Sequence, residues 1–229
     1  MVKSLLYFKG DFLMLVVFEG GDGSGKTSAI EYVNKKVRES APCEVLNDWF
    51  NNSDVKQKFV TNSELTDTDR LTIINYCRGE SLFKVNQDID FTHILYDRFI
   101  LSTYAYQSTM GIGKLPVLQV AQSINKNLIT FPHCPVFVIM NGVDYETQQQ
   151  RVRQRNNGSA DVFDYISKER YDKLQDFFKN HAKNVLTLHY KHAKIITIDN
   201  TGSLDDLYKQ LDRVVEFILR EQIGESYEG

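Results

Sequence analysis

The sequence predicts an α/β fold in which helices cover both faces of a five-stranded parallel sheet. Five short apolar segments, rich in β-branched residues, are separated by longer stretches whose apolar residues recur at helical spacing. A glycine-rich loop follows the first segment and precedes a helical pattern, which gives the order strand, loop, helix. Because such units connect in a right-handed sense, we expect ligands to gather at the carboxyl ends of the strands.

The expected strands and helices follow in order along the chain. The strands are residues 13–18, 43–46, 93–96, 135–140 and 194–198. The helices are indicated by apolar stripes expected to face the core: Ile30, Val33 and Val37; Leu71, Ile74 and Cys77; Val117, Val120, Ile124 and Leu128; Leu174, Phe177 and Phe178; Leu204, Leu207, Leu211, Val214 and Ile218. With 229 residues, 42% of them hydrophobic, we expect one domain at 13–222, an extension at 1–12 and a tail at 223–229.

Composition narrows the kinds of partner. A net charge of −3 argues against a protein that coats nucleic acid and favours a small anionic ligand. Three scattered cysteines, Cys43, Cys77 and Cys134, suit neither a disulfide framework nor a zinc cluster, which favours the cytoplasm. No apolar run is long enough to cross a bilayer, and Lys9 and Asp11 interrupt the region where a signal peptide needs an apolar core. We therefore expect no membrane partner.

A phosphate-loop motif, G-x-x-x-x-G-K-[ST], occupies the turn after the first expected strand. Glycines let the backbone N–H groups point at phosphates, and the following helix N-terminus adds partial positive charge. Lys26 is expected to reach the β- and γ-phosphates of a nucleoside triphosphate, and Thr27 to bind Mg²⁺. The residues expected to bind this nucleotide are Gly20, Gly21, Asp22, Gly23, Ser24, Gly25, Lys26 and Thr27. The alternative is a glycine-rich turn that ends in Lys-Thr by chance.

Two charged residues follow the third expected strand. Asp97 is placed where a carboxylate can hold Mg²⁺, directly or through water, and Arg98 offers a fork that fits phosphate oxygens. A surface ion pair is the alternative interpretation.

A basic segment follows the fourth expected strand, within a lid that we place at about residues 144–164. Arg151 and Arg155 lie four residues apart and share a helix face, whereas Arg153 points elsewhere. Phosphoryl transfer gains most from electrostatic stabilisation, so arginines that close over the triphosphate are expected catalysts. The alternative is a solvated basic helix face.

Residues 97–107, Asp-Arg-Phe-Ile-Leu-Ser-Thr-Tyr-Ala-Tyr-Gln, resemble the signature D-R-[aromatic]-x-x-S-x-x-A-Y-Q of thymidylate kinases, notably the bacterial type. The Phe-Glu-Gly sequence at residues 18–20 and Asp22 are similar to the same family, and residues 151–155 are similar to its R-x-R-x-R lid run. The resemblance implies a phosphate-loop kinase fold, transfer of the γ-phosphoryl group of ATP to dTMP, Mg²⁺, and a homodimer.

The resemblance also implies an acceptor site. Its residues in this sequence are Asp22, Ile74, Arg78, Arg98, Ser102, Thr103, Tyr106 and Gln107. Asp22 would orient the sugar 3′-hydroxyl, and Tyr106 would crowd the sugar 2′ position. Ser102, Thr103 and Gln107 would lie along the base pocket.

The sequence departs from the family pattern at three places. Ile74 stands where the family has a phenylalanine that stacks on thymine, and an aliphatic side chain lacks the directed stacking of a ring. Residues 47–52 replace an Arg-Glu-Pro-Gly segment, and within them Trp49 and Phe50 are expected either in the core or on the pocket wall. In the lid, Val162 replaces an arginine and Asp164 replaces a glutamate.

Other phosphate-loop functions remain as alternatives. The first is a deoxynucleoside monophosphate kinase of different or broader base choice. A deoxynucleoside kinase would need a general base that activates the 5′-hydroxyl, commonly within an E-R-S-like segment after the second strand. No such segment is present. A GTPase would need N-K-x-D, and residues 125–128 lack its carboxylate, while a motor would end the third strand in Asp-Glu.

Overall fold

A computed structural model describes residues 14–49, 53–62, 64–88, 93–109, 136–156, 166–189 and 193–221. Side chains of residues 53, 60, 61, 67, 82–88, 107–109, 155, 156, 188, 189 and 221 fall outside the description. The expected extension at 1–12, the helix at 117–128, Phe50, Cys134, the tail at 223–229 and the lid beyond residue 156 also lie outside the described residues.

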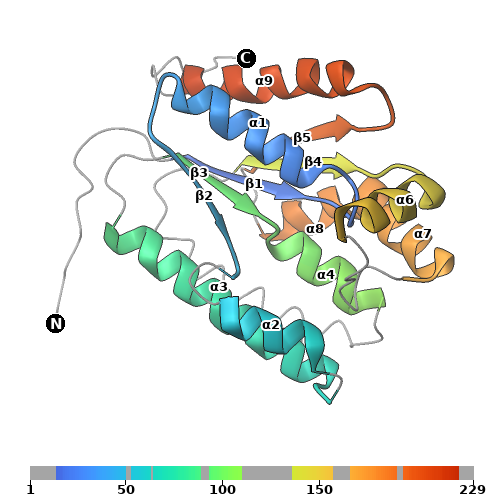
Figure 1. The fold of residues 1–229 in the computed structure, drawn as a ribbon. Coiled ribbons are helices and arrows are strands. Elements are labelled where there is room, and N and C mark those ends of the chain that lie inside the picture. The colour runs from blue at the N-terminus through green and yellow to red at the C-terminus, as the bar shows by residue number, and fades with distance from the viewer. Residues whose placement is uncertain are drawn as a thin grey trace, which may run out of the picture.

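A five-stranded parallel sheet confirms the predicted fold class (Figure 1). Its strands are β1 (Leu15–Glu19), β2 (Cys43–Asn47), β3 (His93–Asp97), β4 (Val136–Asn141) and β5 (Lys194–Asp199). The described helices are α1 (Lys26–Arg38), α2 (Ser53–Thr61), α3 (Asp67–Asp88), α4 (Ile100–Thr109), α6 (Tyr145–Asn156), α7 (Lys168–Asp176), the π-helix η1 (Phe177–His181), α8 (Ala182–His189) and α9 (Leu204–Glu221). The strand order is β2-β3-β1-β4-β5.

The carboxyl ends of the strands form one polar edge. Each strand ends in a polar residue, and the five are Glu19, Asn47, Asp97, Asn141 and Asp199. In register, Asn47 pairs with Asp97 and Asn141 with Asp199. Each strand therefore ends one residue beyond its predicted last residue, because a strand that is apolar along its length can still present a polar group where it reaches the edge of the sheet.

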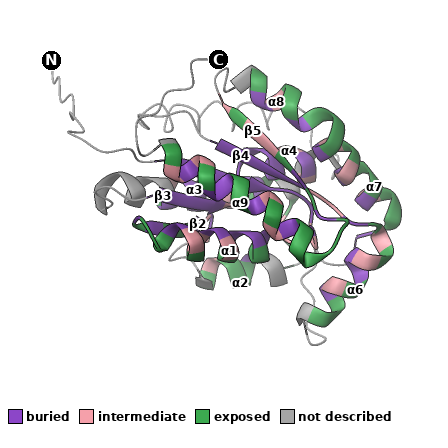
Figure 2. Cartoon of the chain, turned by 90° about the horizontal axis from the view of Figure 1, so that it is seen from above, coloured by how far each residue is buried: buried purple, intermediate pink, exposed green. Residues whose placement is uncertain are grey.

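Burial follows the layers of the fold. Strand β1 is buried along its whole length. Figure 2 shows β3 and β4 buried as well, while the helices around the sheet have both buried and exposed faces. This is the pattern of a parallel sheet covered on both sides, whose strands read as continuous apolar runs.

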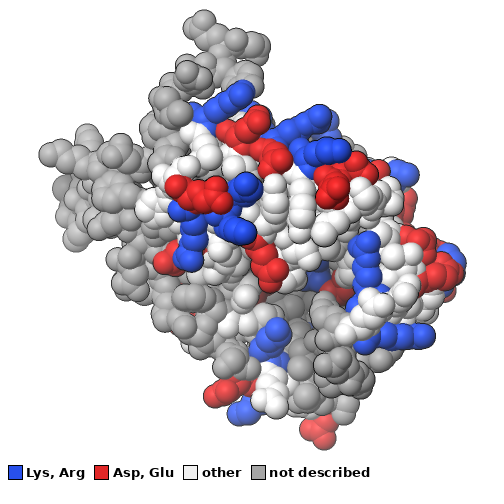
Figure 3. Space-filling view, turned by 45° about the horizontal axis from the view of Figure 1, so that its top comes forward, with Lys and Arg blue, Asp and Glu red and all other residues white. Residues whose placement is uncertain are grey.

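The surface over α1 and α9 carries mixed charge. In Figure 3, acidic and basic side chains lie interspersed over the described part of this face. The described helices include none that is both long and apolar enough to span a membrane.

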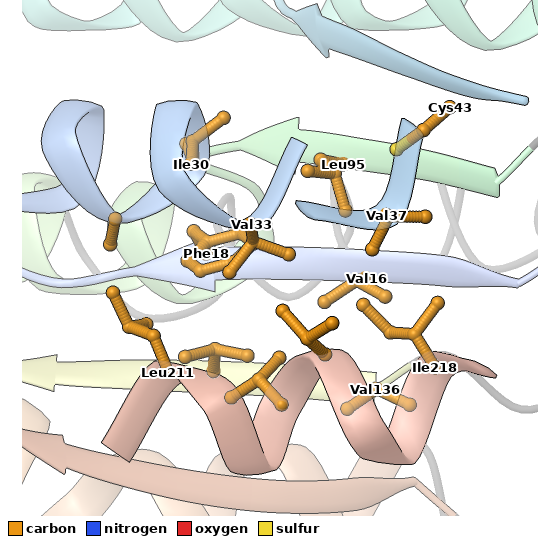
Figure 4. Packing of buried hydrophobic residues seen from close by; sticks show 14 of the residues in the cluster. Val16, Phe18, Ile30, Val33, Val37, Cys43, Leu95, Val136, Leu211 and Ile218 are labelled. Carbon is orange, nitrogen blue, oxygen red and sulfur yellow. The ribbon is translucent and has the colours of Figure 1, made fainter. Parts of the chain in front are cut away.

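The helices α1 and α9 pack side by side on one face of the sheet, with Val33, Leu211 and Ile218 directed at β1 (Figure 4). The predicted stripes of α1 and α9 are buried, with the exception of Leu204, which is 56% exposed and was wrongly assigned to the core. Leu204 is the first residue of α9, and its side chain lines a cavity instead of the core. On the other face, α4, α7, η1 and α8 cover β1, β3 and β4.

Candidate active site

A cavity of about 930 Å³ lies at the carboxyl ends of the strands. It extends from Asn200 and Leu204, after β5, past the phosphate loop to Lys56 on α2 and Ile74 on α3. Elements far apart in sequence therefore open onto one space, which is the position expected for a ligand in a parallel α/β fold.

The phosphate loop connects β1 to α1, which begins at Lys26. Gly25 has a φ of 87°, and a Cβ at this position would come within 2.4 Å of Asn200 Nδ2. Only glycine fits this left-handed and crowded position. Asn200 donates a hydrogen bond to the Ser24 carbonyl at 2.7 Å, so the residue that follows β5 holds the loop in place.

Lys26 folds back into the loop that precedes it. Its ammonium group donates hydrogen bonds to the carbonyls of Gly20 at 2.9 Å and Gly21 at 2.8 Å, and its side chain is buried. Burial lowers the pKa of Lys26 to about 8; the charge of Arg98 acts in the same direction, and Asp22 opposes it. The lysine is thus held beside the loop in a setting that favours an incoming anion.

Arg98, Asp22 and Tyr106 form one cluster beside the loop. The Arg98 guanidinium pairs with Asp22, and the Tyr106 hydroxyl donates to the other Asp22 oxygen at 2.5 Å. The same guanidinium donates to Tyr106 at 3.3 Å and lies over its ring. Arg98 has a φ of 66°, an unusual conformation for a non-glycine residue and one that occurs at functional sites.

Asp97 and Thr27 offer oxygen atoms to the same cavity. Asp97 Oδ1 is buried, and no described residue donates a hydrogen bond to it. A carboxylate and a hydroxyl are ligands that Mg²⁺ prefers, and Mg²⁺ commonly binds through one or two carboxylates together with substrate phosphates. Among the described residues, no group of three or more acidic, histidine or cysteine side chains would hold a metal by itself. The two residues therefore fit a metal that arrives with a nucleotide.

Glu19, at the end of β1, was not among the predicted site residues. Its carboxylate accepts hydrogen bonds from the backbone N–H groups of Phe99, Leu101 and Ser102 and from the Ser102 hydroxyl. Burial raises the pKa of Glu19, while the Ser102 hydrogen bond and the charges of Arg78 and Arg98 offset part of the rise. Glu19 fixes the start of α4 and uses the Ser102 hydroxyl that we expected in the base pocket. The signal in the sequence was a carboxylate that ends an apolar strand.

The acceptor end of the cavity has apolar walls. Ile74 lines it, as does Trp49, whose ring packs against Phe59 at 4.9 Å. Trp49 therefore stands on the pocket wall and outside the core, which decides between the two expected positions. Tyr76 is 64% exposed and does not line the cavity.

Arg78 closes the inner end of this pocket. Its side chain is 1% exposed and pairs with Asp48, and it also donates a hydrogen bond to Thr103. Burial acts to lower the pKa of Arg78, but the charge of Asp48 outweighs it and raises the value above normal. Gln107 belongs to α4, but its side chain lies outside the described residues.

The helix α6 supplies the lid arginines. Arg151 lines the cavity and donates a hydrogen bond to the Gly23 carbonyl at 3.1 Å. Arg153 is exposed and does not line the cavity, as expected for the other helix face. The Arg155 side chain lies outside the described residues.

Two cations of the acceptor end were also missed by sequence reasoning. Arg70 is buried and donates to the carbonyls of Phe59 and Asn62. Lys56 lines the cavity and has no hydrogen bond or ion pair with any described residue. Both lie on helices that showed no distinguishing motif, so only the fold brings them to the pocket.

Comparison with known proteins identifies the family. The family model for Thymidylate kinase matches residues 18–211. A thymidylate kinase of Acholeplasma laidlawii is 27% identical over 212 residues, which cover 86% of this chain and 95% of that protein. One of Mycoplasma capricolum is 29% identical over 226 residues, which cover 91% and 97%. The crystal structure of thymidylate kinase from Ehrlichia chaffeensis, 21% identical, matches the fold with a TM-score of 0.60 over 90% of this chain and 98% of that one. The chain therefore belongs to the thymidylate kinase family and is an ATP-dependent nucleotide kinase.

Proposed function

We propose that the cavity at the sheet edge is where this chain, as a thymidylate kinase, transfers the γ-phosphoryl group of ATP to dTMP and forms dTDP. The observation that carries the proposal is that one cavity contains the phosphate loop, Arg98 and an apolar pocket with Ile74 and Arg78. Arg98 pairs with Asp22 of the loop and touches Tyr106 of α4, so it stands where the two nucleotides would meet.

The donor nucleotide would occupy the phosphate loop. Lys26 would exchange the carbonyls of Gly20 and Gly21 for phosphate oxygens, which are better partners for an ammonium group. Thr27 and Asp97 would hold Mg²⁺, which when bound neutralises negative charge on the phosphates. Arg151 would exchange the Gly23 carbonyl for the transferred phosphoryl group, whose charge is greatest in the transition state.

The acceptor nucleotide would lie between Arg98 and the apolar pocket. Arg98 would bind its phosphate, while Asp22 would accept a hydrogen bond from the sugar 3′-hydroxyl and Tyr106 would exclude a 2′-hydroxyl. Lys56 would supply the phosphate contact that the missing Arg-Glu-Pro-Gly segment makes in the family, since it lines this end of the cavity and pairs with no carboxylate of the described part of the chain.

A monophosphate kinase of broader base choice is the second candidate. The observation that favours it is Ile74, which lines the cavity where the family pattern has a stacking ring. Trp49 lines the same pocket and offers a ring from another direction. Which base the pocket prefers depends on whether this ring takes over the stacking.

A coupled assay of ADP release with ATP and dTMP, dUMP, dCMP or dGMP tests both candidates. We expect the highest kcat/KM with dTMP, and comparable values for all four nucleotides would favour the broader enzyme. Lys26→Ala tests whether the activity arises at this site. Loss of the loop cation should abolish phosphoryl transfer when the variant is prepared and assayed in the same way as the parent protein. Turnover of Lys26→Ala at the parent rate would show that transfer occurs elsewhere.

Two properties of the whole molecule are further proposals. A homodimer is supported by the family resemblance, and light scattering of the purified protein would measure it. A cytoplasmic location is supported by the free cysteines Cys43 and Cys77, and fractionation of cells that express the tagged chain would test it.

A further inference from the structure

We propose that Asp48 is a positioning residue that holds Arg78 and cancels its charge, so that the inner end of the acceptor pocket receives the uncharged base and not a phosphate. The inference rests on the proposed function. It concerns an acidic residue at the end of the β2 strand that no sequence motif singled out.

The pair is built with both partners removed from solvent. Arg78 Nε donates to Asp48 Oδ1 at 2.8 Å and Arg78 Nη2 to Asp48 Oδ2 at 2.6 Å, which is a two-point contact. The Arg78 side chain is 1% exposed and that of Asp48 10% exposed. Tyr96, on β3, donates its hydroxyl to Asp48 at 2.9 Å and fixes the carboxylate from the sheet side.

The guanidinium is constrained on its other sides as well. Its Nη1 atom donates to Thr103 Oγ1 at 3.0 Å, and the Phe99 ring lies 5.0 Å from its central carbon. Of the five N–H groups of an arginine, three are therefore used, and the two that remain are on Nη1 and Nη2. Because Arg78 lines the cavity, these two can serve a ligand there only in a fixed direction.

Charge decides what this ligand is. A buried two-point pair has little net charge, so it gives a phosphate no attraction that would repay the loss of its water. An uncharged base edge that presents oxygen or nitrogen acceptors suits two fixed donors. The phosphate is left to the other cations that line this cavity, which include Arg98, Lys56 and Arg70.

Asp48→Asn tests the inference because it removes the charge and keeps the shape. The guanidinium then becomes an unneutralised buried cation, which attracts anions. We expect KM for dTMP to rise by about tenfold, KM for ATP to stay within about twofold, and inorganic phosphate to become at least about fivefold more potent as a competitor of dTMP. Adding Arg78→Met to Asp48→Asn should return phosphate inhibition to the parent level.

Val214→Ala is the control for lost stability. Val214 is buried in the core between α9 and the sheet and does not line the cavity. We expect a lower Tm with unchanged KM and phosphate inhibition, because loss of folded molecules lowers the apparent kcat alone. If Asp48→Asn showed this same pattern, Asp48 would have only a structural role and the inference would be wrong.

If Asp48→Asn fails to fold, the double variant Asp48→Asn with Arg78→Met still decides, since it leaves no uncompensated buried charge. It should raise KM for dTMP by about tenfold with little change in KM for ATP. An unchanged KM for dTMP would overturn the inference. Inactivity of the parent protein on dTMP would instead contradict the proposed function.

Discussion

We predict that ATP binding weakens as the pH rises from 7.5 to 9.5, because Lys26 loses its proton in this range. Burial lowers the pKa of Lys26 to about 8 in the ligand-free protein. Phosphates that bind beside it must raise this pKa again, since an adjacent negative charge favours the ammonium form. Below pH 8 the lysine already carries its proton, so affinity is flat, whereas above pH 8 binding must first restore the proton and affinity falls.

The size of the effect follows from this value. For a single group with a pKa of about 8, the protonated fraction falls from about three quarters at pH 7.5 to about 3% at pH 9.5, which weakens binding by about 25-fold or about 1.9 kcal/mol. A lysine with the ordinary value of about 10.4 would lose only about a tenth of its protonated fraction over the same range. The two cases are easily separated.

Titration calorimetry of MgATP into the protein between pH 7.5 and 9.5, at constant ionic strength, measures this dependence. Proton uptake on binding, obtained from buffers of different ionisation enthalpy, should rise toward one proton per site over the range. Lys26→Met is the control, because it removes the titrating group and should bind weakly at every pH. An affinity that changes less than about twofold in the parent protein would refute the shifted pKa and the closed loop that causes it.

Three further predictions concern the loop, the lid and the base. Arg151→Ala should lower kcat by about 10²-fold or more with a smaller change in KM, whereas the exposed Arg153→Ala should have little effect, and equal small losses in steady-state assays would remove the lid mechanism. Ile74→Phe should sharpen the preference for dTMP over dCMP by up to about tenfold in kcat/KM, unless another ring already stacks on the base. Gly25→Ala should lower stability by about 1–3 kcal/mol and abolish ATP binding, because its φ is 87° and its Cβ would meet a side chain at 2.4 Å, whereas Gly79→Ala, with open space in α3, should raise Tm in thermal unfolding.

Local patterns were sufficient to predict most of the fold. The central strands β1, β3 and β4 could be predicted because they are buried on both faces and so appear as apolar runs. Helix α1 could be predicted because Ile30, Val33 and Val37 recur at its period. The phosphate loop was legible because it needs glycine at fixed positions. The assignment of Leu204 to the core was wrong because periodicity gives only the face of the helix on which a residue lies. It does not show that the first residue of α9 borders the cavity.

The parts of the site that were missed depend on pairs that are distant in sequence. Glu19 meets the start of α4 some 80 residues later, and Asp48 meets Arg78 30 residues later. A carboxylate at the end of a strand has the same local sequence whether it faces water or another element. Only the parallel order of β2 and β3, which puts Tyr96 and Asp48 side by side, supplies the partner.

The pairing of Arg78 with Asp48 changes the charge that the acceptor pocket offers to a nucleotide. A sequence comparison places Arg78 at a nucleotide-binding position but assigns it a full positive charge, because it cannot see the paired Asp48. With the pair formed, the positive charge that the described residues offer to a phosphate at the acceptor end comes from Lys56, from Arg70 and, in part, from Arg98, which is paired with Asp22. A phosphate is attracted by net positive charge, whereas a base is bound through shape and directed hydrogen-bond donors. If Asp48 neutralises Arg78 as we propose, the phosphate of dTMP should lie toward the loop and its base toward Arg78. The orientation of dTMP would then depend on which arginines are paired with carboxylates as well as on where the arginines lie.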